Sequence, residues 1–217
     1  YDRSPYGNDG TLSGGTICNA TSGKYGSGCY FDGSDDAITV TDNPSLDNVT
    51  TFEIWVNPLA EQAGAVVLDY LFYKDSTNKQ GILIRRDTSP DQFYGVFHDG
   101  TTEASAAWSI PDPAKWYHVV ATFDYSDGKT RLYVNGELKK TSAAISGHAG
   151  QDSNLIIGGE SSRYVNVLVD EARVYSRALA PEEIRTHYLR GKGFGASGAI
   201  TANVFRVVNT SGTARIH

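Results

Sequence analysis

The sequence predicts an all-β sandwich with one short helix near its C-terminal end. The first observation behind this prediction is a series of short runs rich in β-branched and aromatic residues. The second is the turn chemistry between them, as in Asp99-Gly100 and Asn135-Gly136, because such pairs tolerate the positive φ of tight turns. Many short strands separated by such turns are typical of a sandwich. The predicted strands are residues 37–40, 51–56, 81–85, 93–97, 117–123, 131–134, 155–158 and 172–175.

Composition narrows the class of protein further. The chain has 217 residues, of which 40% are hydrophobic and 20% charged, and its formal net charge is −6. It is long enough to bury a hydrophobic core, and its apolar runs are too short for the roughly 20 residues that a membrane-spanning helix needs. Because acidic residues are in excess and no basic stripe is present, nucleic-acid binding is not expected. We expect a globular protein without membrane insertion.

Residues 117–123 have the pattern of a central strand. Alternation sends His118 and Val120 to one face and Val119 and Phe123 to the other, so neither face is fully exposed to solvent. A His in such a strand is typically a hydrogen-bonded packing residue, and no Ser or Cys nucleophile motif accompanies this one. The pattern therefore favours a structural role for His118 over a general base.

The helix is predicted over residues 181–189. Pro181 suits the first helical position, two glutamates follow in the first turn, and Ile184 and Tyr188 share one face. Gly191 is the predicted stop. Beyond it, residues 191–217 change character, because glycines recur before a β-rich run at 202–208. We interpret 1–190 as one domain and 191–217 as a Gly-rich linker with an extra strand.

The two cysteines and the N-terminus bear on localisation. Cys18 and Cys29 are best interpreted as one disulfide, and two free buried thiols are the alternative. The glycosylation sequons at Asn19, Asn48 and Asn209 are also compatible with secretion. The chain begins with tyrosine and contains no methionine, so we interpret it as a mature product or an excised domain.

Several segments, in order and spacing, resemble one known family. These segments are Trp-Tyr-His-Val-Val-Ala-Thr-Phe-Asp at 116–124, Arg-Leu-Tyr-Val-Asn-Gly-Glu-Leu at 131–138, Ile-Ile-Gly-Gly at 156–159, Val-Asp-Glu-Ala-Arg-Val-Tyr-Ser-Arg-Ala-Leu at 169–179 with Glu182-Glu183-Ile184, and the opening segments 2–12, 30–36 and 52–56. They look like the signatures of laminin-G-like, concanavalin-A-like jelly-roll domains. The resemblance covers residues 1 to about 190.

The resemblance implies a specific architecture. It implies two antiparallel sheets that face each other in a jelly roll, with the first and last strands paired and the termini close together. One departure is Val167, where the family usually has glycine, and this departure concerns the local turn and not the fold.

Acidic residues suggest a calcium site. A jelly roll that pairs its first and last strands would bring distant carboxylates together, and Ca²⁺ accepts six to eight oxygen ligands. The resemblance points to the same position, between the N-terminal loop, the Asp-Gly turn and the Asp-Glu pair. Asp35 and Glu171 lie beside the candidates; turn-forming or solvated carboxylates are the alternative. The expected ligands are Asp2, Asp32, Asp36 and Asp170.

Aromatic residues suggest a carbohydrate site. A sugar ring packs its apolar face on an aromatic platform while polar groups bind its hydroxyls. Most aromatics of a sandwich fill its core, and we expect this of Tyr70, Phe72 and Tyr73. The loops around 103–108 and 146–163 are long enough to form a rim. The candidate ligand-binding residues are Tyr94, His98, Trp108 and Tyr164.

Three classes of function remain. We expect a non-catalytic binding or adhesion module, secreted or on a cell or virion surface, that binds carbohydrate or glycoprotein with Ca²⁺ and belongs to a longer chain. A structural spacer or oligomerisation domain is the first alternative. A glycan-cleaving hydrolase or lyase is the second, although no Glu-x-Asp-x-x-Glu run occurs and the only acids worth considering, in or next to predicted strands, are Glu53 and the Asp170-Glu171 pair.

Overall fold

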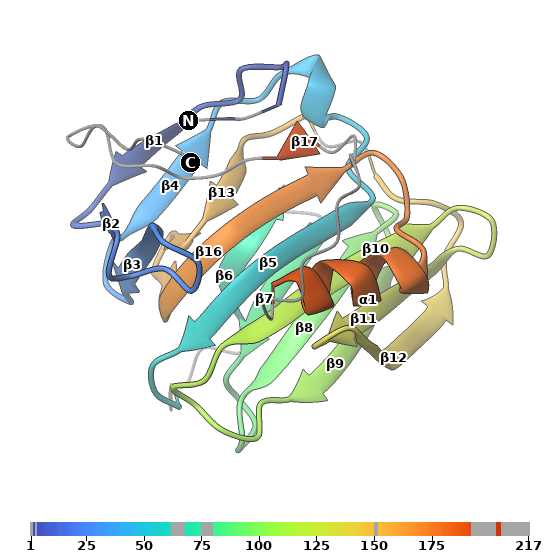
Figure 1. Ribbon diagram of the computed structural model, residues 1–217. Coiled ribbons are helices and arrows are strands. Elements are labelled where there is room, and N and C mark those ends of the chain that lie inside the picture. Colours follow the sequence, from blue (N-terminus) through green and yellow to red (C-terminus); the bar gives the residue numbers. More distant parts are fainter. Residues whose placement is uncertain are drawn as a thin grey trace.

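The protein is a sandwich of two antiparallel sheets, as predicted (Figure 1). The computed structural model describes residues 2, 4–61, 68–74, 80–149 and 152–191, together with the backbone of 203 and 204. One sheet has seven strands in the order β1, β4, β13, β6, β7, β8, β9. Their bounds are β1 Gly10–Ser13, β4 Ala37–Val40, β13 Leu155–Ile157, β6 Leu68–Lys74, β7 Gln80–Arg85, β8 Gln92–His98 and β9 Glu103–Ser109.

The other sheet has eight strands. Its order is β12, β11, β10, β5, β16, β3, β2, and β17 pairs with β16 beside this path. Their bounds are β12 Glu137–Ala144, β11 Lys129–Val134, β10 Tyr117–Asp124, β5 Thr51–Pro58, β16 Asn166–Tyr175, β3 Gly28–Asp32, β2 Ile17–Asn19 and β17 Asn203–Val204. A small hairpin, β14 (Gly159–Glu160) and β15 (Arg163–Tyr164), and the 3₁₀ turn Pro44–Leu46 complete the strands and turns.

Strands from the two ends of the sequence pair directly. β3 lies antiparallel to β16, with Phe31 opposite Val167. The family resemblance implied that the first and last strands pair, but the first strand, β1, pairs with β4 in the other sheet, and it is the third strand that lies beside β16. Val167 is fully buried between β3 and β5, so the residue that departs from the family pattern is accommodated within a regular ladder.

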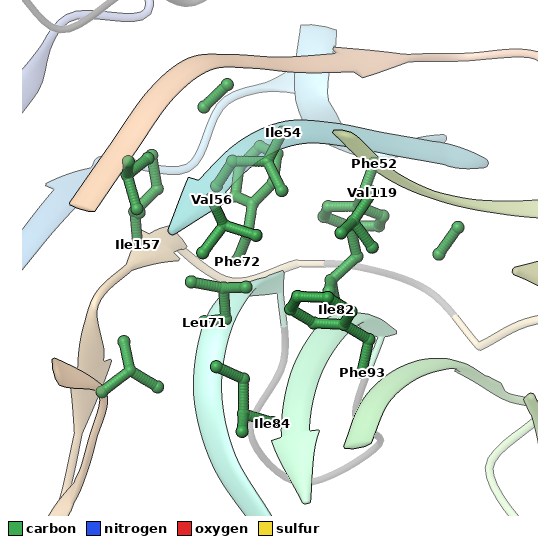
Figure 2. Close-up of a cluster of buried hydrophobic side chains, with 14 of the residues drawn as sticks. Phe52, Ile54, Val56, Leu71, Phe72, Ile82, Ile84, Phe93, Val119 and Ile157 are labelled. Carbon is green, nitrogen blue, oxygen red and sulfur yellow. The ribbon is translucent and has the colours of Figure 1, made fainter. Parts of the chain in front are cut away.

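The main core lies between the sheets. Inward-facing residues of β5 and β10 pack against residues of β6, β7, β8 and β13 (Figure 2). They include Phe52, Ile54, Val56, Phe72, Ile82, Phe93, Val119 and Ile157, which are all fully buried. β5 is buried along its entire length, because its other face is also covered.

Helix α1 (Pro181–Arg190) lies across the outer face of the eight-stranded sheet (Figure 1). It was predicted one residue shorter. Ile184 packs there with Val120, Tyr133, Tyr175 and Leu179. Within the described residues, no helix is both long and apolar enough to span a bilayer.

The ends of α1 are defined by specific contacts. Ala180 at the N-cap position has no side chain that can accept a helix N–H, but the Glu183 carboxylate accepts the Ala180 N–H at 3.0 Å, as in one half of a capping box. At the other end, a Cβ on Gly191 would lie 2.6 Å from the Trp55 ring, so only glycine allows this close approach. Beyond Gly191, the predicted extra strand at 202–208 lies outside the described residues except for 203 and 204, which pair with β16.

One disulfide closes the N-terminal part of the chain. Cys18 on β2 and Cys29 on β3 are directly opposite in the ladder, and they are bonded. The predicted disulfide is therefore confirmed, and the alternative of two free thiols is wrong. Both residues are buried against the main core.

A candidate binding groove and an acidic loop

A groove of about 380 Å³ opens beside helix α1 at the end of the β11–β12 hairpin. Its volume is within the range of small-ligand sites, and it is open to solvent. Its aromatic and polar lining comprises Trp108, Asn135, Glu137, Lys139, Arg185 and Tyr188. The groove therefore combines two aromatic rings with an amide and three charged side chains.

The Asn-Gly turn positions the hairpin against the helix. Asn135 and Gly136 have φ values of 54° and 76°, which is the conformation expected for a two-residue hairpin turn. A Cβ on Gly136 would lie 3.0 Å from the Tyr188 ring, so glycine also allows the close contact with α1. Asn135 Oδ1 accepts the backbone N–H of His118 at 3.0 Å, which fixes its side chain.

The two aromatic rings are held differently. Trp108 on β9 packs edge-on against Tyr117, with ring centroids 6.1 Å apart, and is half-buried. Lys139 Nζ lies 5.5 Å from the Trp108 ring and 2.7 Å from the Glu137 carboxylate. Tyr188 stacks on Trp55 at 5.8 Å. The Tyr188 ring on the helix thus forms one wall of the groove, and the ion-paired Lys139 side chain borders the indole.

The other three predicted ligand-binding residues lie elsewhere. Phe93 on β8 is opposite Trp108 on β9, so these two side chains lie on the same face of the sheet. Tyr94 is the next residue of β8, and its side chain therefore lies on the other face. His98 ends β8, and its Nδ1 accepts the Gly100 N–H at 2.9 Å. Tyr164 lies on β15, which contacts β6. The structure therefore does not bring the four candidate residues together, and of these four only Trp108 lines the groove.

Tyr94 belongs instead to a second packed cluster on the outer face of the seven-stranded sheet. Leu83 and Val96 are fully buried there, and Tyr70 stacks on Tyr73 at 4.3 Å. The Tyr94 hydroxyl donates to Glu103 or Ser105. Burial, together with the hydrogen bond to Glu103, raises the pKa of Tyr94 to about 12. This face is closed rather than an open aromatic platform.

An acidic loop follows β3. Carboxylate oxygens of Asp32, Asp35 and Asp36 lie within 4.8 Å of one another. Asp36 is buried and accepts the Gly15 N–H at 2.5 Å and the Asp32 N–H at 2.7 Å. Asp32 and Asp35 are exposed. Three hard oxygen donors this close suit Ca²⁺ chemically, with room for water or carbonyl ligands at the exposed side.

Asp2 and Asp170 do not join this loop, which corrects the predicted four-carboxylate site. Asp2 accepts the backbone N–H groups of Ser4 and Asn8, each at 2.8 Å, and so closes the N-terminal loop. Asp170 is buried and accepts the Tyr25 N–H at 2.8 Å. Asp32 lies opposite Asn166 in the ladder, and Asn166 is four residues from Asp170 along β16. The backbones of Asp32 and Asp170 are therefore about 13 Å apart along the strand direction.

Glu53, the acid considered for hydrolysis, lies beneath α1. It is 1% exposed and accepts hydrogen bonds from His118 and from the Tyr175 hydroxyl. Burial alone would raise its pKa, but hydrogen bonds from His118 and His187 outweigh burial and hold the pKa of Glu53 well below its usual range. The residue is an ionised structural anchor, and His118 is buried against it.

Sequence reasoning found Trp108 but missed the rest of the groove. Asn135 was interpreted only as a turn residue and Tyr188 only as part of a helix face. Glu137, Lys139 and Arg185 carry no motif, because ordinary surface strands and helices also contain such residues. They line one groove only because the β11–β12 hairpin packs against helix α1.

Comparison with known proteins identifies a family and two relatives with similar sequence. The family model Laminin_G_3, described as the Concanavalin A-like lectin/glucanases superfamily, matches residues 32–185. Adhesion G-protein coupled receptor D1 of Homo sapiens is 34% identical over 101 residues, which are 44% of this chain and 11% of the receptor. The Bos taurus receptor of the same name is 29% identical over 118 residues, 52% of this chain and 13% of the receptor. The chain thus spans only about a tenth of these relatives.

Solved structures show the same architecture. The botulinum neurotoxin serotype D binding domain superposes with a TM-score of 0.64 at 16% identity and covers 86% of this chain and 48% of its own. The binding domain of Paraclostridial Mosquitocidal Protein 1 gives 0.65 at 18% identity, over 84% and 48%. At this identity the likeness concerns the fold alone. Since the family match spans well over half of the sequence and agrees with the sandwich described above, the chain belongs to the laminin G-like family of the concanavalin A-like lectin/glucanase superfamily.

Proposed function

We propose that this protein is a non-catalytic binding module, displayed outside the cell or on a surface, that binds carbohydrate in the Trp108 groove. The observation that supports it most is the groove itself, which pairs a half-buried indole with an amide and charged groups. Such a lining suits a sugar ring and its hydroxyls. The relatives agree with a binding role, because they are named as an adhesion receptor and as toxin binding domains.

The charges of the groove favour a saccharide that carries a carboxylate or sulfate. Lys139 and Arg185 are two cations against the single carboxylate of Glu137, in a chain whose overall charge is −6. Because Glu137 already pairs with Lys139, an anionic ligand has Arg185 as its first cationic partner.

A glycan array with neutral and acidic glycans tests this proposal. We expect the wild-type chain to bind a subset of glycans and Trp108→Ala to lose most of this binding, because stacking on an aromatic ring supplies about 1 kcal/mol or more. Arg185→Ala is expected to weaken the binding of acidic glycans selectively, and Lys139→Ala to weaken it less, because Lys139 is already paired with Glu137.

Two matched controls accompany the array. Tyr6→Ala removes an aromatic ring that is 55% exposed, and Lys140→Ala removes the neighbouring lysine of β12. Both are expected to bind like the wild type. Binding that survives Trp108→Ala would contradict the groove, and an array blank for every glycan would favour a structural spacer.

We further infer that the acidic loop binds Ca²⁺ through Asp32, Asp35 and Asp36. When bound, the ion would neutralise three close carboxylates and tie the loop after β3 to the Gly15 backbone that Asp36 holds. The support is the donor chemistry and the short separation of the oxygens.

A further inference from the structure

Helix α1 reaches the eight-stranded sheet through a buried cluster around one carboxylate. Glu53 lies on β5, and His118 Nε2 from β10 is 2.9 Å from its Oε1. His187 Nδ1 from α1 is 3.0 Å from Oε2, and the Tyr175 hydroxyl of β16 donates to the same oxygen at 2.8 Å. His187 is therefore the polar contact that fixes the helix, beside the apolar contact of Ile184.

Each imidazole uses only one of its nitrogens. His118 Nδ1 and His187 Nε2 are buried and have no hydrogen-bond partner among the described residues. A neutral imidazole carries one N–H, which here is donated to Glu53. A second proton on either ring would bury an N–H without an acceptor, and this is unfavourable.

The charges around the cluster limit its capacity for protons. Arg173 Nη1 lies 3.4 Å from Glu53 Oε1, and its other terminal nitrogen pairs with Glu171. The carboxylates of Glu53 and Glu171 and the guanidinium of Arg173 together carry one net negative charge. The positive charge of one protonated imidazole is therefore balanced, and the positive charge of a second is not. The other titratable groups near the two imidazoles are Tyr175, Tyr188 and Glu183. Glu183 forms a bidentate salt bridge with Arg177.

We propose that this cluster is a proton-controlled latch, in which protonation of both His118 and His187 releases helix α1 from the sheet. In the released state His187 returns to water, where its protonation is unopposed. By linkage, protons therefore favour release. Arg185 and Tyr188 line the Trp108 groove from α1, so acidification also removes one wall of the groove, a consequence that rests on the function proposed above.

Hydrogen exchange of the whole chain without ligand tests the latch. Protection factors, corrected for the intrinsic exchange rate, are measured at about pH 7.5 and about pH 5, on either side of the usual histidine range. We expect the protection of residues 181–190 to fall roughly tenfold or more at the lower pH, while β10 keeps its protection. Equal protection of α1 at both pH values would overturn the proposal.

Substitutions at the two histidines show whether the loss of α1 protection at low pH depends on the latch or reflects a general destabilisation of the protein by acid. His187→Gln and His118→Gln each retain an N–H for Glu53 but cannot titrate, so α1 is expected to stay protected at both pH values. His98→Gln, in the other sheet, is the matched control and should keep the wild-type loss. If His187→Gln does not fold, His118→Gln decides the test. A wild-type acid transition in a folded latch variant contradicts the latch, whether or not the groove binds glycan.

Discussion

At the scale of single residues, the donors around a carboxylate decide its role. Asp36 accepts two backbone N–H groups and is buried, whereas Asp32 and Asp35, a few residues away, are exposed. Glu53 remains ionised in a buried position because imidazole and hydroxyl groups surround it. Carboxylate side chains therefore serve as loop anchor, candidate ligand and helix anchor.

The acidic loop gives a prediction at this scale. Added Ca²⁺ is expected to raise the melting temperature of the wild-type chain by several degrees, since an ion that binds only the folded state stabilises it, and EDTA should reverse the rise. Asp35→Asn should abolish the rise, because it removes a charge from the cluster without changing its shape.

Asp152→Asn is the control, since it removes an exposed carboxylate far along the sequence. It is expected to leave the Ca²⁺ response unchanged. A melting curve that is indifferent to both Ca²⁺ and EDTA would show that the three carboxylates bind no calcium.

The residues also show where prediction from sequence ends. Asp32 and Asp36 could be grouped because four positions separate them. Asp170 could not be placed, because its separation from Asp32 depends on the register of β3 against β16, which sets Asp32 opposite Asn166. The next residue, Glu171, takes a positive φ of 51° where β16 shifts register against β5. A bulge of this kind redirects side chains and has no reliable sequence signal.

At the scale of elements, predictability follows the strength of the local pattern. The helix was predicted because proline, acidic residues and glycine occupy its ends. β6 was missed because all seven of its residues are buried, so it lacks alternation. β12 was missed for the opposite reason, since its residues are largely exposed at a sheet edge.

Gly191 gives the prediction at this scale. Its φ of −65° suits any residue, so Gly191→Ala tests the contact of a Cβ with the Trp55 ring and the Tyr25 hydroxyl rather than backbone strain. We expect a loss of about 1–3 kcal/mol in the free energy of unfolding, measured by urea denaturation, because overpacking forces α1 from its position.

Gly147→Ala is the matched control. A Cβ at this position would lie 3.8 Å from Tyr125, an ordinary contact. Its free energy of unfolding should remain close to that of the wild type. Equal stability of the two variants would show that the end of α1 adjusts without cost.

At the scale of the whole molecule, the disulfide ties the edge strand β2 to the rest of the sheet. Replacing both cysteines by serine is expected to lower the free energy of unfolding by roughly 3 kcal/mol in the chain-entropy model, because the unfolded chain regains the freedom of the closed loop. Urea denaturation measures the loss, and the wild type under reducing conditions should show the same loss. Unchanged midpoints in both cases would contradict this contribution.

Both broad surfaces of the sandwich are partly covered by the chain itself. Helix α1 lies over one sheet, and a cluster of tyrosine, leucine and valine side chains closes the outer side of the other. An open groove of about 490 Å³ remains on the outer face of the eight-stranded sheet, where Thr122, Arg131 and Tyr133 line it beside the start of α1. The other open surface lies at the perimeter, where hairpins, helix ends and strand borders meet, so we expect changes in specificity between relatives to accumulate mainly in turns and to leave the ladders intact.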